Sequence, residues 1–320
     1  MKNQWEGGSS GRVAAIDLGT NTFLLLIAEM DRGKVRPLLE KETVVRLGKG
    51  LQKEGLISEN SMRRGWQTLS EYLVLCKEWR VQRVFAVGTS ALREAKNATD
   101  FLQRIQEKLD LTVEVISGEE EACLSYTAVA RDLDNSETSI MVIDVGGGST
   151  ELIRGRGDRI LERVSLPMGL VRFTERFLTS NPVRPEEYHA MEREIQVQLD
   201  RIPQSPDPVT LVSVGGTGTT LASVAQGLSE FDAERIHHFV LKGDALRRQL
   251  TLFLSKTIEQ RKAIPGLPPA RADVILAGAA ILCRTMERLR CPSVLISSHG
   301  VRYGLLYQKL TAPVHGARGL

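Results

Sequence analysis

The chain has 320 residues, of which 42% are apolar and 25% charged, and a formal net charge of +3. This composition is typical of an ordinary globular protein that is long enough for two domains with real cores. The small net charge excludes a surface that is strongly basic throughout, as in many nucleic-acid-binding proteins. The 42 lysines and arginines still allow a local basic cleft.

No apolar run approaches the length that a membrane span needs. Residues 1–12 are polar and rich in Gly and Ser, without the hydrophobic core of a signal peptide, so we expect a frayed tail there. The cysteines form no CxxC pair; they are Cys76, Cys123, Cys283 and Cys291. Widely spaced cysteines predict reduced thiols in a cytoplasmic protein.

Strands and helices alternate along the first part of the chain. Two apolar runs, 13–16 and 23–29, are separated by a turn and predict a buried hairpin. Ser58 and Thr99 are the expected N-caps of two helices. The other elements expected here are strands over 35–45, 83–87 and 112–116 and helices over 63–79, 101–109 and 119–131, followed by a polar loop over 132–138.

The same alternation begins again with a strand at Ile140. An N-cap near Asn181 opens a polar helix expected over 182–202, and prolines separate that helix from the next strand. The remaining elements expected are strands over 151–154, 160–164, 210–214 and 294–297 and helices over 245–254, 272–288 and 304–310. The predicted class is therefore α/β with two lobes, each containing one Asp-x-Gly hairpin.

Three glycine-containing segments follow apolar strands. They read Asp17-Leu18-Gly19-Thr20-Asn21-Thr22, Asp144-Val145-Gly146-Gly147-Gly148-Ser149-Thr150-Glu151 and Gly215-Gly216-Thr217-Gly218-Thr219-Thr220. A strand rather than a helix follows the first two, so neither is a Rossmann fingerprint or a P-loop. Gly19 alone is compatible with a plain hairpin turn, but ordering three consecutive glycines is costly enough to favour a functional loop. Because backbone N–H groups in such turns can surround a phosphate, the three segments predict a cleft for phosphate and a metal ion.

Carboxylates and hydroxyls are the metal ligands that the sequence offers. No HExxH motif or Cys/His cluster is present, and three histidines are expected to be structural or surface residues: His237, His238 and His299. Asp144 and Glu151 form the best candidate pair across a hairpin, and Asp17 is the facing candidate from the other lobe. Hard oxygen ligands indicate Mg²⁺, or Mn²⁺, rather than zinc. Glu151 is alternatively a solvated strand residue.

Three consecutive glutamates, Glu119, Glu120 and Glu121, open a helix after Ser117-Gly118. Acidic residues in a first turn stabilise a helix through its dipole, which accounts for at least one of them. The functional interpretation is that one glutamate faces the cleft and removes a proton from water. The start of the helix would keep the carboxylate of that glutamate ionised, as a base requires.

Two arginines are candidate phosphate ligands. Arg93 follows Gly88-Thr89-Ser90 just past a strand end, which is where α/β sheets bind ligands, and Arg172 has a similar setting. An arginine there can bind phosphate bidentately. Each is alternatively one half of a surface salt bridge.

These motifs resemble the exopolyphosphatase and guanosine pentaphosphate phosphohydrolase (Ppx/GppA) family of the actin, Hsp70 and sugar kinase superfamily. The resemblance covers residues 13–306 and is carried by 15–22, 87–97, 116–122, 144–152, 214–217 and 271–275. It implies two related ribonuclease H-like lobes with an interdomain cleft. Residues 1–122 would form the first lobe and 123–298 the second, with the helix of 299–320 packed back on the first.

The resemblance also implies residue roles. The catalytic glutamate falls on Glu121, with Glu120 as the fallback. Asp144 and Glu151 match metal- and water-positioning residues, and Arg93 matches a phosphate-binding arginine. The remaining substrate-binding positions are Thr20, Asn21 and Thr22, then Gly146, Gly147, Gly148 and Ser149, and finally Gly215, Gly216 and Thr217.

The implied activity is metal-assisted attack of water on the terminal phosphate of inorganic polyphosphate. The alternative substrate is guanosine pentaphosphate, the nucleotide of the stringent response. A kinase of the same superfamily and a non-catalytic sensor of either ligand are further alternatives. Neither nucleic acid nor a membrane is expected as a partner, and a homodimer is left open.

The sequence departs from the family pattern in two places. Tyr303 stands where members usually carry glutamate, which affects a local ion pair more than catalysis. The chain stops near residue 320, where longer members continue with helical C-terminal domains, so strong processivity on long polyphosphate is not implied.

Overall fold

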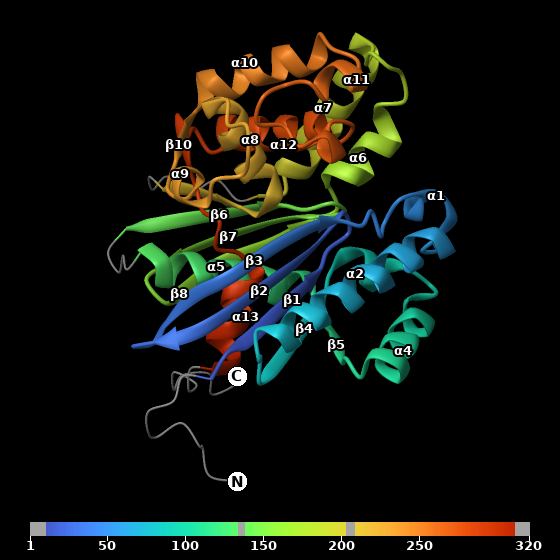
Figure 1. The fold of residues 1–320 in the computed structure, drawn as a ribbon. Helices are drawn as coiled ribbons and strands as arrows, with labels where there is room; N and C mark the ends of the chain where they lie inside the picture. The colour runs from blue at the N-terminus through green and yellow to red at the C-terminus, as the bar shows by residue number, and fades with distance from the viewer. Residues whose placement is uncertain (1–10, 134–137, 203–208, 311–320) are drawn as a thin grey trace.

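Two β-sheets, with helices between and around them, make up the described part of the chain (Figure 1). The structure is a computed structural model that describes residues 11–133, 138–202 and 209–310. Most of the tail expected over 1–12 and of the loop expected over 132–138 lies outside the described residues. So do Pro203, Pro206, Pro208 and residues 311–320.

The first sheet has the strand order β3-β2-β1-β4-β5. β1 (Val13–Leu18) and β2 (Thr22–Asp31) form the expected antiparallel hairpin, which β3 (Lys34–Val44) extends. β4 (Arg83–Gly88) and β5 (Val113–Val115) join it in parallel.

The second sheet has the order β10-β11-β9-β6-β7-β8. Its strands are β6 (Ser139–Val145), β7 (Thr150–Arg156), β8 (Arg159–Leu166), β9 (Thr210–Val214), β10 (Val240–Lys242) and β11 (Ser293–Ile296). β6, β7 and β8 form an antiparallel meander, and β9 and β11 join in parallel. Apart from the edge strand β10, this order repeats that of the first sheet. The prediction of an α/β fold with two related ribonuclease H-like lobes is thereby confirmed.

The helices that cover the sheets follow the chain in order. They are α1 (Leu51–Glu54), α2 (Glu59–Glu78), α3 (Ser90–Glu94), α4 (Ala98–Leu109), α5 (Gly118–Leu133), α6 (Leu170–Phe177), α7 (Pro185–Leu199), α8 (Gly215–Gln226), α9 (Ala233–Ile236), α10 (Gly243–Leu254), α11 (Ile258–Arg261), α12 (Ile275–Arg288) and α13 (Val301–Leu310). Within the described ranges, none of them combines the length and the apolar character that crossing a lipid bilayer requires.

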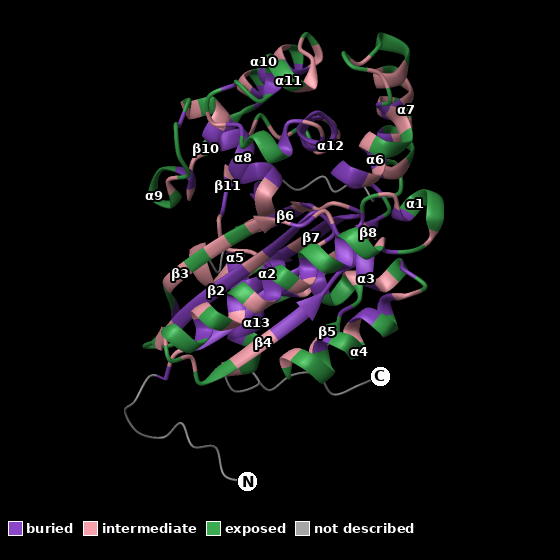
Figure 2. Ribbon diagram, turned by 45° about the vertical axis from the view of Figure 1, so that its right-hand side comes forward, coloured by how far each residue is buried: buried purple, intermediate pink, exposed green. Residues whose placement is uncertain are grey.

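Alternation along the strands divides the interior into layers. In β1, Ala14 and Ile16 belong to the core that lies under α2 and α4, whereas Val13 and Ala15 face α5 and α13. The opposite side of α5 packs through Tyr126 on the second sheet. Helix α5 therefore lies between the two sheets with α13 beside it on the first sheet, and β2 is buried along most of its length (Figure 2).

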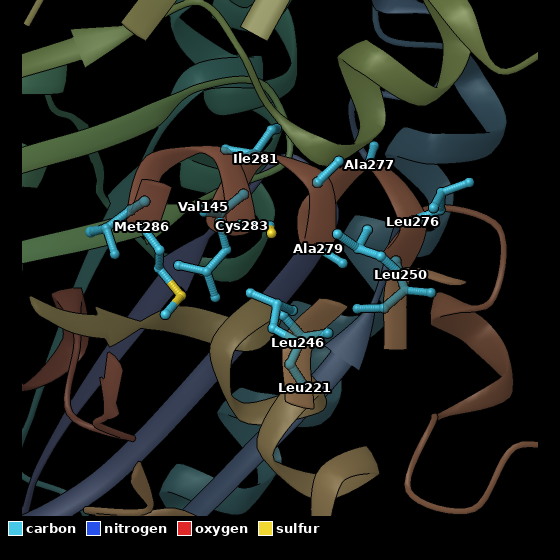
Figure 3. Packing of buried hydrophobic residues seen from close by; sticks show 14 of the residues in the cluster. Val145, Leu221, Leu246, Leu250, Leu276, Ala277, Ala279, Ile281, Cys283 and Met286 are labelled. Atoms are coloured by element: carbon cyan, nitrogen blue, oxygen red, sulfur yellow. The ribbon is translucent and has the colours of Figure 1, made fainter. Parts of the chain in front are cut away.

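The outer face of the second sheet carries the largest core. There α12 runs between β6 and α10, and its alanines Ala277 and Ala279 allow close approach of the leucines of the neighbouring helices (Figure 3). Leu221, Leu246 and Leu250 pack against it. This buried layer includes Val145 at the end of β6 and so packs directly beneath the glycine segment that follows that strand.

Several helix starts differ from those predicted. α4 begins at Ala98 after Asn97, not after Thr99, and Asn97 uses its side chain to bind both backbone groups of Ile57. α7 begins at Pro185 rather than near 182. α12 begins at Ile275 because residues 269–271 form a separate 3₁₀ turn, and α13 begins at Val301. Tertiary contacts decided these ends, where local signals are weakest.

Candidate active site

The predicted glycine segments meet at one cavity between the two lobes. Its lining includes these predicted residues: Asp17, Thr20, Asn21, Thr22, Glu121, Asp144, Gly146, Gly147, Ser149, Gly215, Gly216 and Thr217. Gly148, Arg93, Glu120 and Glu151 are not part of the lining. Most of the predicted site residues therefore line this cavity, although they make up less than half of its lining. Of the four that do not line it, Gly148, Arg93 and Glu151 contact residues that do.

Asp17 and Asp144 occupy equivalent positions, one residue before the end of β1 and of β6. Both lie against the cavity, and Oδ1 of Asp17 has no hydrogen-bond partner among the described residues. Burial raises the pKa of Asp17 to about 8, helped by repulsion from Glu121 and Asp144. Burial and the charge of Glu121 likewise raise the pKa of Asp144 to about 7. The duplicated hairpins therefore bring two buried carboxyl groups together, and Arg302 and Arg93 offset the raised pKa of Asp17 only in part.

Glu151 is fully buried, so the alternative that it is a solvated strand residue is wrong. It pairs with Asp144 on the neighbouring strand, and its Oε1 accepts a hydrogen bond of 2.7 Å from Ser165 Oγ. Oε2 has no partner among the described residues. Burial raises the pKa of Glu151 well above its usual range, and Glu121 and Asp144 raise it further.

The three glutamates at the start of α5 separate into different environments. Glu119 forms a surface ion pair with Arg163 at 2.8 Å, and Glu120 is exposed and accepts a hydrogen bond from the backbone N–H of Ser117. Only Glu121 is buried at the cavity. The predicted ionising effect of the helix start does not dominate, because burial raises the pKa of Glu121 while Arg93 opposes that shift.

Arg93 and Arg172 are both engaged by protein groups. Arg93 Nη1 lies 2.7 Å from Glu121 Oε2 and also donates to the carbonyl of Ile116. Arg172 Nε donates to the carbonyl of Gly148, and its Nη2 bonds Glu94 of the first lobe at 2.7 Å. Arg172 therefore forms a salt bridge between the lobes, which agrees with the alternative interpretation of this arginine as one half of a salt bridge.

Glycine is required at 147 and 148 because the loops of the two lobes touch. A Cβ on Gly147 would lie 2.7 Å from Thr20 Cβ, and one on Gly148 would lie 2.2 Å from Ser90 Oγ. Gly215 has φ +78° and begins α8, so the third segment is a helix start rather than a turn. A Cβ there would lie 2.5 Å from Asp144 Oδ1.

Two arginines of the cavity were missed in the sequence. Arg271 Nε bonds Glu42 at 3.1 Å across the lobes, and Arg302 Nη2 bonds Glu40 at 3.0 Å. Tyr303, which stands in place of the family's glutamate, also donates a hydrogen bond to Glu40. Glu40 is thus the acidic partner of both Arg302 and Tyr303. Arg271 opens the family stretch 271–275 and Arg302 directly precedes Tyr303, but only the fold shows that their partners come from β3.

Three of the chain's five histidines gather around Asp132, which the sequence did not predict. His237 and His238 stack with ring centroids 3.9 Å apart, and the ring of His299 lies 4.4 Å from that of His237 at a tilt of 31°. His237 Nδ1 accepts the N–H of Ser298, so its Nε2 carries the proton that faces Asp132. The rings donate toward one carboxylate and form a hydrogen-bonded cluster. The ligand atoms of Asp132, His237 and His238 also lie within 4.8 Å of one another, which is close enough to hold a metal ion.

The carboxylates at the cavity fit a hard divalent cation. Two buried oxygens, Asp17 Oδ1 and Glu151 Oε2, lack partners among the described residues, and the charges of Glu121 and Asp144 raise the pKa of both Asp17 and Glu151. Oxygen donors and unneutralised negative charge are what Mg²⁺ or Mn²⁺ requires.

Mg²⁺ is expected to raise the melting temperature more at pH 8 than at about pH 5. Asp17 and Asp144 have folded-state pKa values above their usual 3.8, so their ionisation makes the metal-free protein less stable as the pH rises from about 4 to 8. A cation cancels that repulsion only when the groups are ionised. Thermal melts with and without Mg²⁺ at both pH values measure the effect, and an equal shift at both would contradict it.

Comparison with known proteins places the chain among phosphatases. The sequence profile of the Ppx/GppA phosphatase family matches residues 26–312. Exopolyphosphatase 2 of Mycobacterium tuberculosis is 33% identical over 310 residues, covering 92% of this chain and 97% of that protein. The crystal structure of the Aquifex aeolicus Ppx/GppA family member matches with a TM-score of 0.80 at 35% identity, covering 94% of this chain and 98% of that one. An exopolyphosphatase from Cytophaga hutchinsonii matches with a TM-score of 0.86 at 29% identity, covering 93% and 97%.

Proposed function

Because the chain belongs to the Ppx/GppA phosphatase family, we propose that it is an exopolyphosphatase that hydrolyses the terminal phosphate of inorganic polyphosphate. The observation that supports this most is the position of Glu121, which is buried at the cavity with Asp17 and Asp144 and held by Arg93. A general base, candidate metal ligands and phosphate loops thus share one cleft.

Asp17, Asp144 and Glu151 are the residues that would hold the divalent ion. When bound, Mg²⁺ or Mn²⁺ supplies positive charge beside the phosphate oxygens. Gly147, Ser149 and the start of α8 line the cavity, and in this proposal their backbone N–H groups would bind the non-bridging oxygens of the terminal phosphate.

Glu121 acts as the general base in this proposal. Ionised Glu121 takes a proton from a water molecule whose oxygen attacks the terminal phosphorus in line. The bond from that phosphorus to the bridging oxygen breaks. The products are inorganic phosphate and a polyphosphate that is one phosphate unit shorter. Arg93 orients the carboxylate and favours its charged form. The phosphate-binding role predicted for Arg93 stays a prediction.

A second cavity supports guanosine pentaphosphate as the alternative substrate. This cavity, of about 740 Å³, shares Glu42, Phe231 and Arg271 with the first. Phe231 is 64% exposed, so its ring is available to stack on a base. Polyphosphate has no group that would use such a ring.

Phosphate release from polyphosphate and from guanosine pentaphosphate, measured side by side with and without Mg²⁺, tests the proposal. Mg²⁺-dependent release from polyphosphate supports it, and faster release from the nucleotide favours the alternative. Phosphate transfer from ATP to an added acceptor would indicate a kinase instead. Tight binding of either substrate without release would indicate a sensor.

A further inference from the structure

A row of polar residues crosses three strands of the second sheet. Asp144 on β6 pairs with Glu151 on β7, which pairs in turn with Ser165 on β8. Because directly paired residues present their side chains on the same face of a sheet, all three project toward α5. That helix contributes Glu121 and also Ser125, whose Oγ lies 3.4 Å from Asp144 Oδ2.

The two oxygens of Glu151 have different environments. Ser165 Oγ donates to Oε1 at 2.7 Å, whereas Oε2 is buried and lacks a partner among the described residues. A buried carboxylate oxygen without a partner is costly unless a bound group satisfies it. Ser165 therefore holds Oε1, and Oε2 remains available to a metal ion beside the carboxylate cluster, where Ser149 is a further hydrogen-bonding neighbour of Glu151.

We propose that Ser165 is a positioning residue that holds Glu151 in the orientation needed to bind the divalent ion. This inference rests on the proposed function, because it concerns the metal site of the same reaction. Ser165 is not part of the cavity lining and so acts through Glu151 rather than on substrate. Partners of ligating carboxylates commonly tune metal affinity about 10–100-fold.

The local backbone makes room for this contact. A Cβ on Gly118, the first residue of α5, would lie 2.6 Å from Ser165 Oγ. The absence of a side chain at 118 thus lets β8 bring its hydroxyl next to the helix that carries Glu121. Ser165 thus bonds the candidate metal ligand Glu151 at a point where β8 lies against the first residue of α5.

Titration of the metal-stripped full-length chain with Mn²⁺, followed by calorimetry, tests the proposal. In Ser165→Ala we expect the Kd for Mn²⁺ to rise by about 10–100-fold, with an unchanged KM for polyphosphate at saturating Mn²⁺. Ser213→Ala is the matched control, because Ser213 is a fully buried serine on the nearby strand β9 whose Oγ has no partner among the described residues. Its Mn²⁺ affinity should equal that of the unmodified chain.

Ser165→Cys keeps a weak S–H donor and should give an intermediate affinity, which covers the case in which the alanine variant does not fold. Equal Mn²⁺ affinity in Ser165→Ala and Ser213→Ala would overturn the inference. An unmodified chain that binds Mn²⁺ but releases no phosphate would overturn the proposed function. A weakened Mn²⁺ affinity in Ser165→Ala would, even then, support the positioning role.

Discussion

Replacement of Glu121 by Gln is expected to lower kcat for phosphate release by about 10²–10⁴-fold, the usual contribution of a general base. Glutamine has nearly the same shape and can still accept the hydrogen bond from Arg93, so the cavity should keep its form. It cannot accept the proton of the attacking water. Steady-state phosphate release, together with polyphosphate binding measured by calorimetry, should show lost turnover and retained affinity.

Glu120→Gln is the matched control for that variant. Glu120 is the adjacent residue, yet it is exposed and bonds the backbone N–H of Ser117, a role that glutamine also fills in a capping box. Its turnover should equal that of the unmodified chain. If Glu121→Gln retained full activity, or if Glu120→Gln lost it, the assignment of the base to Glu121 would be wrong.

The sequence predicted the fold well because its signals are local. Each lobe contains an apolar run, an Asp-x-Gly turn and a second apolar run, which is sufficient to indicate a hairpin. The helix boundaries were less predictable. Asn97 is the N-cap residue of α4, but its side chain binds the backbone of Ile57, about 40 residues away, instead of the helix. The segment starting at Gly215 reads as a turn, but packing against β6 makes it a helix.

The part of the candidate site that lies at the ends of strands could be predicted, because the two hairpins bring those ends to one cavity. Asp17 and Asp144 follow from their positions in the two hairpins. The distinction among Glu119, Glu120 and Glu121 does not, because it depends on which face of α5 meets the second sheet. The cluster around Asp132 was beyond prediction for the same reason: its histidines come from segments more than 100 residues away.

Asp144→Asn is expected to abolish Mg²⁺-dependent phosphate release and at the same time to raise the melting temperature of the metal-free protein. The pKa of Asp144 is raised from 3.8 to about 7, which corresponds to at most about 4 kcal/mol of destabilisation when the group is ionised. Asparagine keeps the shape and the contact with Ser125 but carries no charge. Because the cost of ionisation is complete only above about pH 7, the gain in stability should be largest at pH 8 and vanish near pH 4.

Asp132→Asn should show the opposite behaviour and is the natural control. Burial would raise the pKa of Asp132, but hydrogen bonds from His237, His299 and His238 outweigh burial and hold that pKa well below its usual range. Removing this charge should cost about 1–3 kcal/mol of stability at neutral pH and leave phosphate release intact. Thermal melts and phosphate assays on both variants separate the two roles. If Asp144→Asn were less stable than the unmodified chain at pH 8, the carboxylate of Asp144 would stabilise the fold, and the destabilisation expected from its ionisation would be refuted.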